Sequence, residues 1–272
     1  MKKQLVLDAG LNQKIIGIIP ARYGSTRFPG KILAPIAGKT LIQRTYENAS
    51  QNSILQQLII ATDDDRIYDH VETFGAKAVM TSITCPTGTD RLVEAVKHSL
   101  NLAGADIIVN IQGDEPCLDP QIITQIVTLL INDPEAVMST AAIQIHSEEE
   151  AHNPSAVKCV IDSQQNALYF SRALIPAGHS GRMLPNTAYY RHIGIYAYRA
   201  HFLLKYADLP KTPSQLAEDL EQLKVIEHGF RIKVAIVDSF SIGVDTPKDI
   251  QKVEQWLHKQ NTSLSQAASV PL

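Results

Sequence analysis

The sequence has few cysteines, and they are not spaced for a metal site or a disulfide framework. Cys85, Cys117 and Cys159 are the only thiols among 272 residues, and no two of them form a CxxC pair. This pattern argues against a disulfide-stapled secreted protein and against a structural zinc site. A reducing compartment is the simplest interpretation, and we predict a cytoplasmic location.

Long hydrophobic runs and an excess of positive charge are also missing. No run approaches the roughly 20 apolar residues of a membrane-spanning helix. Asp8 interrupts the apolar segment that follows the first lysines, so we expect no secretory signal. With 25 basic and 28 acidic residues the net charge is -3. We therefore expect neither nucleic acid nor a membrane as a partner, and any phosphate site should be a local cluster.

The chain has the composition of a folded globular protein, with 44% apolar and 19% charged residues. Short apolar segments alternate with amphipathic segments through about residue 132. This alternation predicts a doubly wound α/β sheet. The predicted strands are 14–20, 58–62, 78–80 and 106–112, and the predicted helices are 41–49, a segment that begins at 63–65, 90–102 and 120–132.

The middle of the chain, about 137–207, has a different pattern, because strand-like runs follow one another closely. We predict a smaller β-rich lobe there, within a single domain that covers 14–259. We interpret 1–13 as a loose N-terminal extension and 260–272 as a flexible tail. The other predictions for this part are strands at 157–161, 193–198 and 232–237, a loop at 178–186, and helices at 214–228 and from Pro247 through Trp256.

The loop 20–31, PARYGSTRFPGK, follows the first predicted strand and carries Arg22, Arg27 and Lys31. Ligands of open α/β sheets bind beyond the carboxyl ends of strands. Guanidinium forks and ammonium groups suit phosphate oxygens. The loop is neither a Walker A motif nor GxGxxG, which disfavours P-loop NTPases and classical dehydrogenases. A phosphate-binding loop and a solvated basic surface loop both remain open on composition alone.

This loop resembles the N-terminal signature of the sugar-acid cytidylyltransferases, and within them of the branch that acts on 3-deoxy-D-manno-octulosonate (KDO). Further matching segments follow in family order from about residue 15 to residue 256. They are ATD (61–63), TGTDRL (87–92), NIQGDEP (110–116), AVK (156–158), YFSRA (169–173), RHIGIY (191–196), LEQL (220–223) and GVDTP (243–247). The resemblance implies a Rossmann-like nucleotidyltransferase fold. This fold has a mostly parallel sheet, helices on both faces and a smaller β-rich lobe that contributes to a homodimer.

The resemblance also implies a reaction. CTP and KDO would give CMP-KDO and pyrophosphate with Mg²⁺, for lipopolysaccharide biosynthesis. Two alternatives stay open: a cytidylyltransferase for another acidic sugar, such as an 8-amino analogue or an acylneuraminate, and a non-catalytic nucleotide-binding module.

Two aspartates lie just beyond predicted strand ends. Asp114 follows 106–112 and Asp245 follows 232–237. Carboxylates are ligands that Mg²⁺ prefers, and the resemblance implies that these two hold the metal. The alternatives are a turn residue for Asp114 and a cap of the final helix for Asp245.

The resemblance assigns further residues to the nucleotide. Arg22, Arg27 and Lys31 would bind the triphosphate, and Arg22 and Lys31 would be catalytic together with the two aspartates. Asp90 has the simplest interpretation as a helix cap. The residues expected near the base are Gly88, Thr89, Arg91 and Gln112.

The sugar acid needs a cation for its carboxylate, and Arg172 matches the family's substrate region; a structural ion pair is the alternative. His192 and Tyr196 are separated by an even number of residues and should face one side of a strand. The resemblance makes them sugar contacts, together with Glu221 and Gln222. Ordinary core or exposed polar roles remain open for these four residues.

Overall fold

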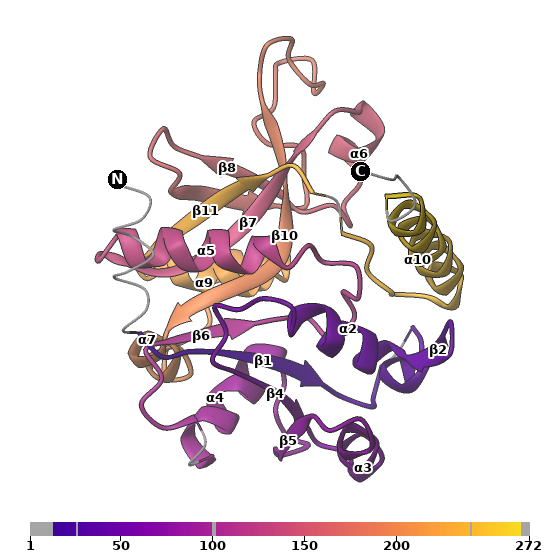
Figure 1. The fold of residues 1–272 in the computed structure, drawn as a ribbon. Helices are drawn as coiled ribbons and strands as arrows, with labels where there is room; N and C mark the ends of the chain where they lie inside the picture. The colour runs from indigo at the N-terminus through magenta and orange to yellow at the C-terminus, as the bar shows by residue number, and fades with distance from the viewer. Residues whose placement is uncertain (1–12, 26, 100–101, 240, 268–272) are drawn as a thin grey trace.

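The structure is a computed structural model that describes residues 13–25, 27–99, 102–239 and 241–267. Its centre is a nine-stranded sheet with the main order β11-β7-β10-β6-β1-β4-β5, from which β8 and β9 branch off beside β10 (Figure 1). The strands are β1 (Ile15–Ala21), β2 (Pro35–Ile36), β3 (Lys39–Thr40), β4 (Gln57–Thr62), β5 (Lys77–Met80), β6 (Ile107–Asn110), β7 (Ala136–Ile145), β8 (Lys158–Ile161), β9 (Ala167–Ser171), β10 (Tyr189–Arg199) and β11 (Arg231–Val237). The helices are α2 (Leu41–Ala49), α3 (Asp65–Thr73), α4 (Gly88–His98), α5 (Gln121–Asn132), α6 (Glu148–His152), α7 (Ala200–Tyr206), α8 (Pro213–Glu218), α9 (Glu221–Glu227) and α10 (Pro247–Ala267), with one 3₁₀ turn, η1 (Lys31–Leu33).

The sheet is buried on both faces, as the continuous apolar strands predict. Along β1, Ile15 and Ile19 pack into the cluster that includes side chains of α2, α3 and α5. Ile16 and Ile18 pack into the opposite cluster, which includes side chains of α4, α7 and α9. The predicted fold class is therefore confirmed: an α/β sheet with helices on both faces.

Along the main order, most neighbouring strands are parallel. β1 pairs parallel with β4 and β6, β4 with β5, and β7 with β11. β10 is the antiparallel member, against β6, β7 and β8. All strands of the main order except β10 consequently point the same way, and their carboxyl ends share one edge of the sheet. That edge is where α/β proteins bind ligands.

The region predicted as a lobe is continuous with this sheet. β7 and β10 lie in the main order, and only the antiparallel pair β8–β9 branches away. The division of the chain into a main body and a substrate lobe stays a prediction.

Three predicted helices differ from the structure in their boundaries. The predicted helix 90–102 is α4, which begins at Gly88 and ends at His98. The predicted helix 214–228 is two helices, because Asp219 adopts a left-handed backbone with φ 52° between α8 and α9. The last helix continues past Trp256 to Ala267, since no proline or glycine follows Trp256 before that point. The remaining predicted tail residues, 268–272, and residues 1–12 of the predicted extension lie outside the described residues.

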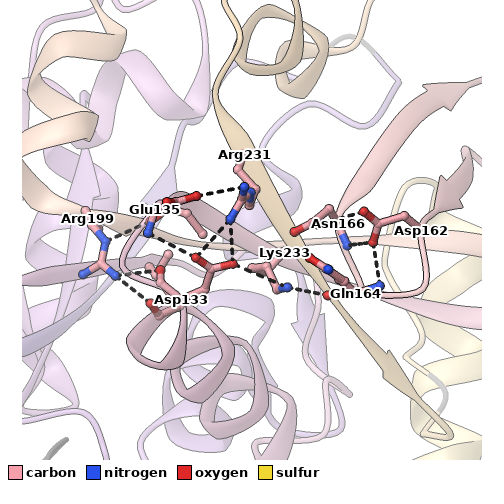
Figure 2. Close-up of polar contacts among 10 residues, drawn as sticks. Asp133, Glu135, Asp162, Gln164, Asn166, Arg199, Arg231 and Lys233 are labelled. Atoms are coloured by element: carbon pink, nitrogen blue, oxygen red, sulfur yellow. Dashed lines mark hydrogen bonds and ion pairs between the residues drawn. The ribbon is translucent and has the colours of Figure 1, made fainter.

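An ion-pair network lies at the opposite side of the sheet from the carboxyl ends of the parallel strands, where α5 ends and β7 and β11 begin (Figure 2). Arg231 pairs with Asp133 at 3.3 Å and with Glu135 at 2.9 Å. Arg199 donates to the backbone carbonyls of Leu130, Asp133 and Ala136. The contacts with Leu130 and Asp133 satisfy carbonyls that the end of α5 leaves without helical partners, and the contact with Ala136 ties this end to β7. Among the described helices, none is both long and apolar enough to cross a bilayer.

Candidate active site

A continuous groove lies beyond the carboxyl ends of the parallel strands. It consists of three cavities of about 330, 230 and 440 Å³, here called the first, second and third cavity. Gln112 and Glu221 line both the first and the second cavity. Tyr196 and Gln222 line the second and the third, and Asp245 lines the first and the third. The shared walls make the three cavities parts of one site.

The loop after β1 forms the cationic wall of the first cavity. Gly30 has φ 70°, a backbone region that glycine adopts readily, and its N–H donates to the Tyr23 carbonyl. This turn precedes η1 and leaves the Lys31 ammonium 3.1 Å from the carbonyl of Val244. The polar loop residues that line the cavity are Arg22, Ser25, Arg27 and Lys31. The fold therefore gathers the predicted phosphate-binding cations at one cavity.

The two predicted metal carboxylates converge on the same ammonium. Lys31 Nζ lies 2.5 Å from Asp114 Oδ2 and 3.5 Å from Asp245 Oδ1. Arg27 also pairs with Asp245 at 2.9 Å. The backbone N–H of Val244 donates to the Asp114 carbonyl, which ties the segments after β6 and β11 together.

Asp245 does not cap the last helix, the alternative that the sequence leaves open. Asp249 accepts hydrogen bonds from the N–H and the hydroxyl of Thr246, at 2.9 and 2.8 Å. Burial would raise the pKa of Asp249, but the hydrogen bond from Lys252 and those from Thr246 lower it to about 2. Asp245 is thereby left to face the cations of the groove.

The donor set fits a magnesium ion bound jointly with a phosphorylated ligand. Lys31 shows that a cation is stable between the two carboxylates. No group of three or more His, Cys, Asp or Glu within the described ranges is arranged to hold a metal. Magnesium commonly takes one or two carboxylates and completes its shell with phosphate oxygens and water. Asp114 and Asp245 match that requirement.

Glu115 is a partly buried residue of this site that no sequence motif marks as functional. Ser241 donates a hydrogen bond to its carboxylate, and a Cβ on Gly243 would lie only 2.8 Å from Glu115 Oε1. Burial raises the pKa of Glu115 to about 7, and the nearby Asp114 adds to the increase. Glu115 thus packs the segment before Asp245 against the segment that carries Asp114. In the sequence, its position next to Asp114 is the feature that could have indicated a place in the site.

The beginning of α4 forms the wall opposite the cationic loop. The sequence predicts Asp90 as the helix cap, but the residue that caps α4 is Thr87. The Thr87 hydroxyl accepts a hydrogen bond from the Asp90 N–H and donates one to the Asp90 carboxylate at 2.8 Å. Gly88 lines the first and second cavities. Thr89 lines the second and donates to Glu221 at 2.5 Å.

Arg91 is placed in the wall of the first cavity. Its side chain is 3% exposed, and it pairs with Asp63 at 2.7 Å and with the Thr81 hydroxyl. Through these contacts Arg91 fixes the position of the ATD segment (61–63) at the end of β4. Gln112 lines both the first and the second cavity. A direct role of either residue at the base stays a prediction.

His192 and Tyr196 both line the third cavity, although a bulge between Ile193 and Tyr196 interrupts the strand register. Their ring centroids are 5.4 Å apart, and the His192 Nε2 lies 2.9 Å from the Thr140 hydroxyl. Burial lowers the pKa of His192 to about 3 and raises the pKa of Tyr196 well above its usual value. Both side chains are consequently neutral near pH 7 and act by hydrogen bonding.

Glu221 and Gln222 open α9 at the far wall of the second cavity. Burial raises the pKa of Glu221, while hydrogen bonds from Thr89 and Thr87 oppose the increase. The Tyr196 hydroxyl lies 3.5 Å from Gln222 Oε1. Tyr196 of β10 and the two α9 residues, all predicted sugar contacts, therefore line the same second cavity.

Arg172 lies apart from these cavities and lines none of the three. Its guanidinium donates to backbone carbonyls of Glu218, Asp219 and Pro154. Arg191, the residue before His192, does line the third cavity, although the sequence did not predict it as a site residue. It pairs with Glu150 at 2.9 Å. The role of Arg172 at the sugar carboxylate stays a prediction.

A mostly parallel α/β sheet with a cationic loop and two converging carboxylates at its carboxyl edge is typical of proteins that bind a phosphorylated nucleotide. Comparisons with known proteins narrow this class.

The cytidylyltransferase family model matches residues 16–234. A 3-deoxy-manno-octulosonate cytidylyltransferase of Protochlamydia amoebophila is 60% identical over 94% of this chain and 99% of its own length. One of Zea mays is 46% identical over 93% of this chain and 84% of its own length. A solved CMP:2-keto-3-deoxy-manno-octonic acid synthetase complexed with CTP has a TM-score of 0.85 at 40% identity, covering 91% of this chain and all of that one. The chain therefore belongs to the cytidylyltransferase family, in its 3-deoxy-manno-octulosonate branch.

Proposed function

We propose that this protein transfers CMP from CTP to KDO, giving CMP-KDO and pyrophosphate for lipopolysaccharide biosynthesis. The observation that carries the proposal is the groove itself. It joins the cationic loop, two converging carboxylates and a polar cavity of sugar size in one site. The names of the relatives and the CTP complex of the structural neighbour support the same substrates.

In the proposed mechanism an anomeric oxygen of KDO attacks the α-phosphorus of CTP. The new P–O bond forms as the bond from the α-phosphorus to the bridging oxygen breaks, pyrophosphate leaves with that oxygen, and water takes the proton of the attacking hydroxyl. Arg22, Arg27 and Lys31 bind the triphosphate and stabilise its charge. Asp114 and Asp245 would hold Mg²⁺, which supplies positive charge at the phosphates when bound. Orientation and charge stabilisation supply most of the rate acceleration.

The sugar acid is proposed to occupy the second and third cavities. His192 lies there with a pKa of about 3, so it is too weak a base to remove the proton of the attacking hydroxyl. Its role is therefore orientation, together with Tyr196. Arg191 is the cation that lines the third cavity, and it supports binding of the sugar carboxylate there.

Homodimerisation and a cytoplasmic location complete the proposal. The resemblance to the sugar-acid cytidylyltransferases supports the homodimer. The free thiols of Cys85, Cys117 and Cys159 support a reducing compartment.

The direct test is pyrophosphate release with Mg²⁺, each of the four nucleoside triphosphates, and KDO, its 8-amino analogue or an acylneuraminate. Release with CTP and KDO alone is the expected result. Release with CTP and another acid would keep the reaction and overturn the acceptor. If folded protein bound CTP and released no pyrophosphate with any acid, a non-catalytic nucleotide-binding module would replace the proposal.

A further inference from the structure

Two buried amide atoms that face the second cavity have no hydrogen-bond partner. Asn110, at the end of β6, is 1% exposed, and Gln222, at the start of α9, is 3% exposed. Both side chains line the second cavity. Asn110 Oδ1 and Gln222 Nε2 are each buried without a partner. Leaving a buried polar atom unpaired destabilises the folded protein, so a ligand group that pairs with the atom gains affinity.

The neighbours of each amide set which of its atoms faces the cavity. The side chains of Asn110 and Thr89 contact the Tyr198 hydroxyl, and both contacts lower the pKa of this phenol, which burial raises. Asn110 Oδ1 is the atom of that amide that is buried without a hydrogen-bond partner. Gln222 Oε1 faces the Tyr196 hydroxyl, which leaves Nε2. The cavity therefore presents one acceptor and one donor.

A hydroxyl group matches this pair, because it donates one hydrogen bond and accepts another. A protonated amine can donate to Asn110 but cannot accept from Gln222, and a methylene group can do neither. The rest of the second cavity is polar, with Thr89, Gln112 and Glu221 in its walls. Its volume of about 230 Å³ suits part of a sugar rather than a whole nucleotide.

We infer that Asn110 is a specificity-determining residue, which together with Gln222 binds one hydroxyl of the acceptor sugar and selects it over a deoxy or amino group. This inference rests on the proposed function, since it assigns a contact to the acceptor of that reaction. Asn110 pairs in register with Tyr196 of β10, so the sheet itself positions its amide. The sequence offers little sign of this role, because Asn110 ends a buried strand.

The test compares kcat/KM for KDO and for its 4-, 5-, 7- and 8-monodeoxy analogues, at saturating CTP, in the native protein and two variants. Asn110→Leu and Gln222→Met remove the hydrogen-bonding atoms and keep most of the volume. The native protein should disfavour one analogue by roughly 10- to 100-fold. Each variant should lose a similar factor with KDO and no longer distinguish KDO from that analogue. KM for CTP should stay unchanged.

Asn166→Leu is the matched control. Asn166 also has a buried Oδ1 without a partner, but it lies in the β8–β9 turn, where it contacts Asp162 and lines none of the three cavities (Figure 2). It should keep the native discrimination.

The inference is overturned if the native protein treats all four analogues like KDO, or if Asn110→Leu lowers kcat/KM equally for every acceptor. Asn110→Val, with a side chain suited to a strand, replaces Asn110→Leu if the latter does not fold. No turnover of KDO by the native protein would instead overturn the proposed function, so the two failures are distinguishable.

Discussion

At the residue scale, the central feature of the site is a cation held between two carboxylates. Lys31, Asp114 and Asp245 come from three segments and meet within 3.5 Å. Two like charges so close together require a cation near both of them. In the proposed reaction the two carboxylates would hold Mg²⁺, whose positive charge offsets theirs and that of the phosphates.

We expect Asp114→Asn and Asp245→Asn each to lower kcat by about 100-fold or more, because a metal ligand loses its charge. The fold should persist, since these side chains are 30% and 53% exposed. The measurement is steady-state pyrophosphate release over a Mg²⁺ titration. Asp162→Asn, in the β8–β9 turn, is the control and should keep the native kcat. Near-native turnover in either site variant would remove the metal assignment.

His192 makes the free energy of unfolding depend on pH. Its pKa falls from 6.5 to about 3 because burial disfavours the charged ring. Between these values the unfolded chain binds a proton that the folded chain does not, so the free energy of unfolding declines as pH falls from 6.5 toward 3. One such proton contributes at most about 1.4 kcal/mol per pH unit.

Urea denaturation at pH 7.5, 6, 5 and 4 measures this decline. His192→Gln should show a shallower loss of stability below pH 6.5 than the native protein, because glutamine does not titrate. Equal slopes for the two proteins would show that His192 is protonated in the folded state.

At the scale of elements, the regular structure follows local patterns and the ends of elements follow side-chain contacts. Continuous apolar runs predicted β1, β4 and β6, and amphipathic periodicity predicted α2. Carboxylates at a helix start predicted α3, and a proline in the first turn predicted α5. The boundaries that differ were decided by capping and backbone conformation. Thr87 rather than Asp90 caps α4, and the left-handed Asp219 separates α8 from α9.

Arg199 binds backbone carbonyls at the end of helix α5 and at the start of β7. Its guanidinium donates to the carbonyls of Leu130, Asp133 and Ala136 at 2.7, 3.0 and 2.8 Å (Figure 2). Arg199→Met should lower the free energy of unfolding by about 2 kcal/mol, because it leaves these carbonyls without their donor. It should leave kcat unchanged, since this edge of the sheet is opposite the groove.

Urea denaturation and pyrophosphate release together test this prediction. Arg66→Met is the control: Arg66 pairs with Asp64 but is 60% exposed, so its loss should change stability far less. A large fall in kcat for Arg199→Met at native stability would contradict the structural role.

At the scale of the whole molecule, the groove exists only because distant segments meet. Its walls come from the ends of β1, β6 and β11 and from the beginnings of α4 and α9. Thr89 and Glu221, for example, are 132 residues apart in sequence and form a hydrogen bond. A ligand that spans these walls should stabilise the entire fold.

CTP with Mg²⁺ should therefore raise the melting temperature, by an amount equivalent to about 2.7 kcal/mol at one hundred times its Kd. Calorimetry over a CTP series measures the effect, and ATP with Mg²⁺ at equal concentration is the control. Lys31→Met should reduce the CTP shift. An ATP shift as large as that of CTP would contradict selection for the cytosine base.

The sequence by itself determined the α/β class, most strands and helices, and the motifs that place the chain among the cytidylyltransferases. Those properties depend on residues near one another in the chain, through periodicity, propensity and turns. Only the tertiary structure decided that Lys31 joins both aspartates, that Arg172 lies outside the groove, and that Asn110 faces Gln222 across a cavity. Contacts between residues more than a hundred positions apart depend on how the sheet is assembled, and local patterns do not encode that assembly.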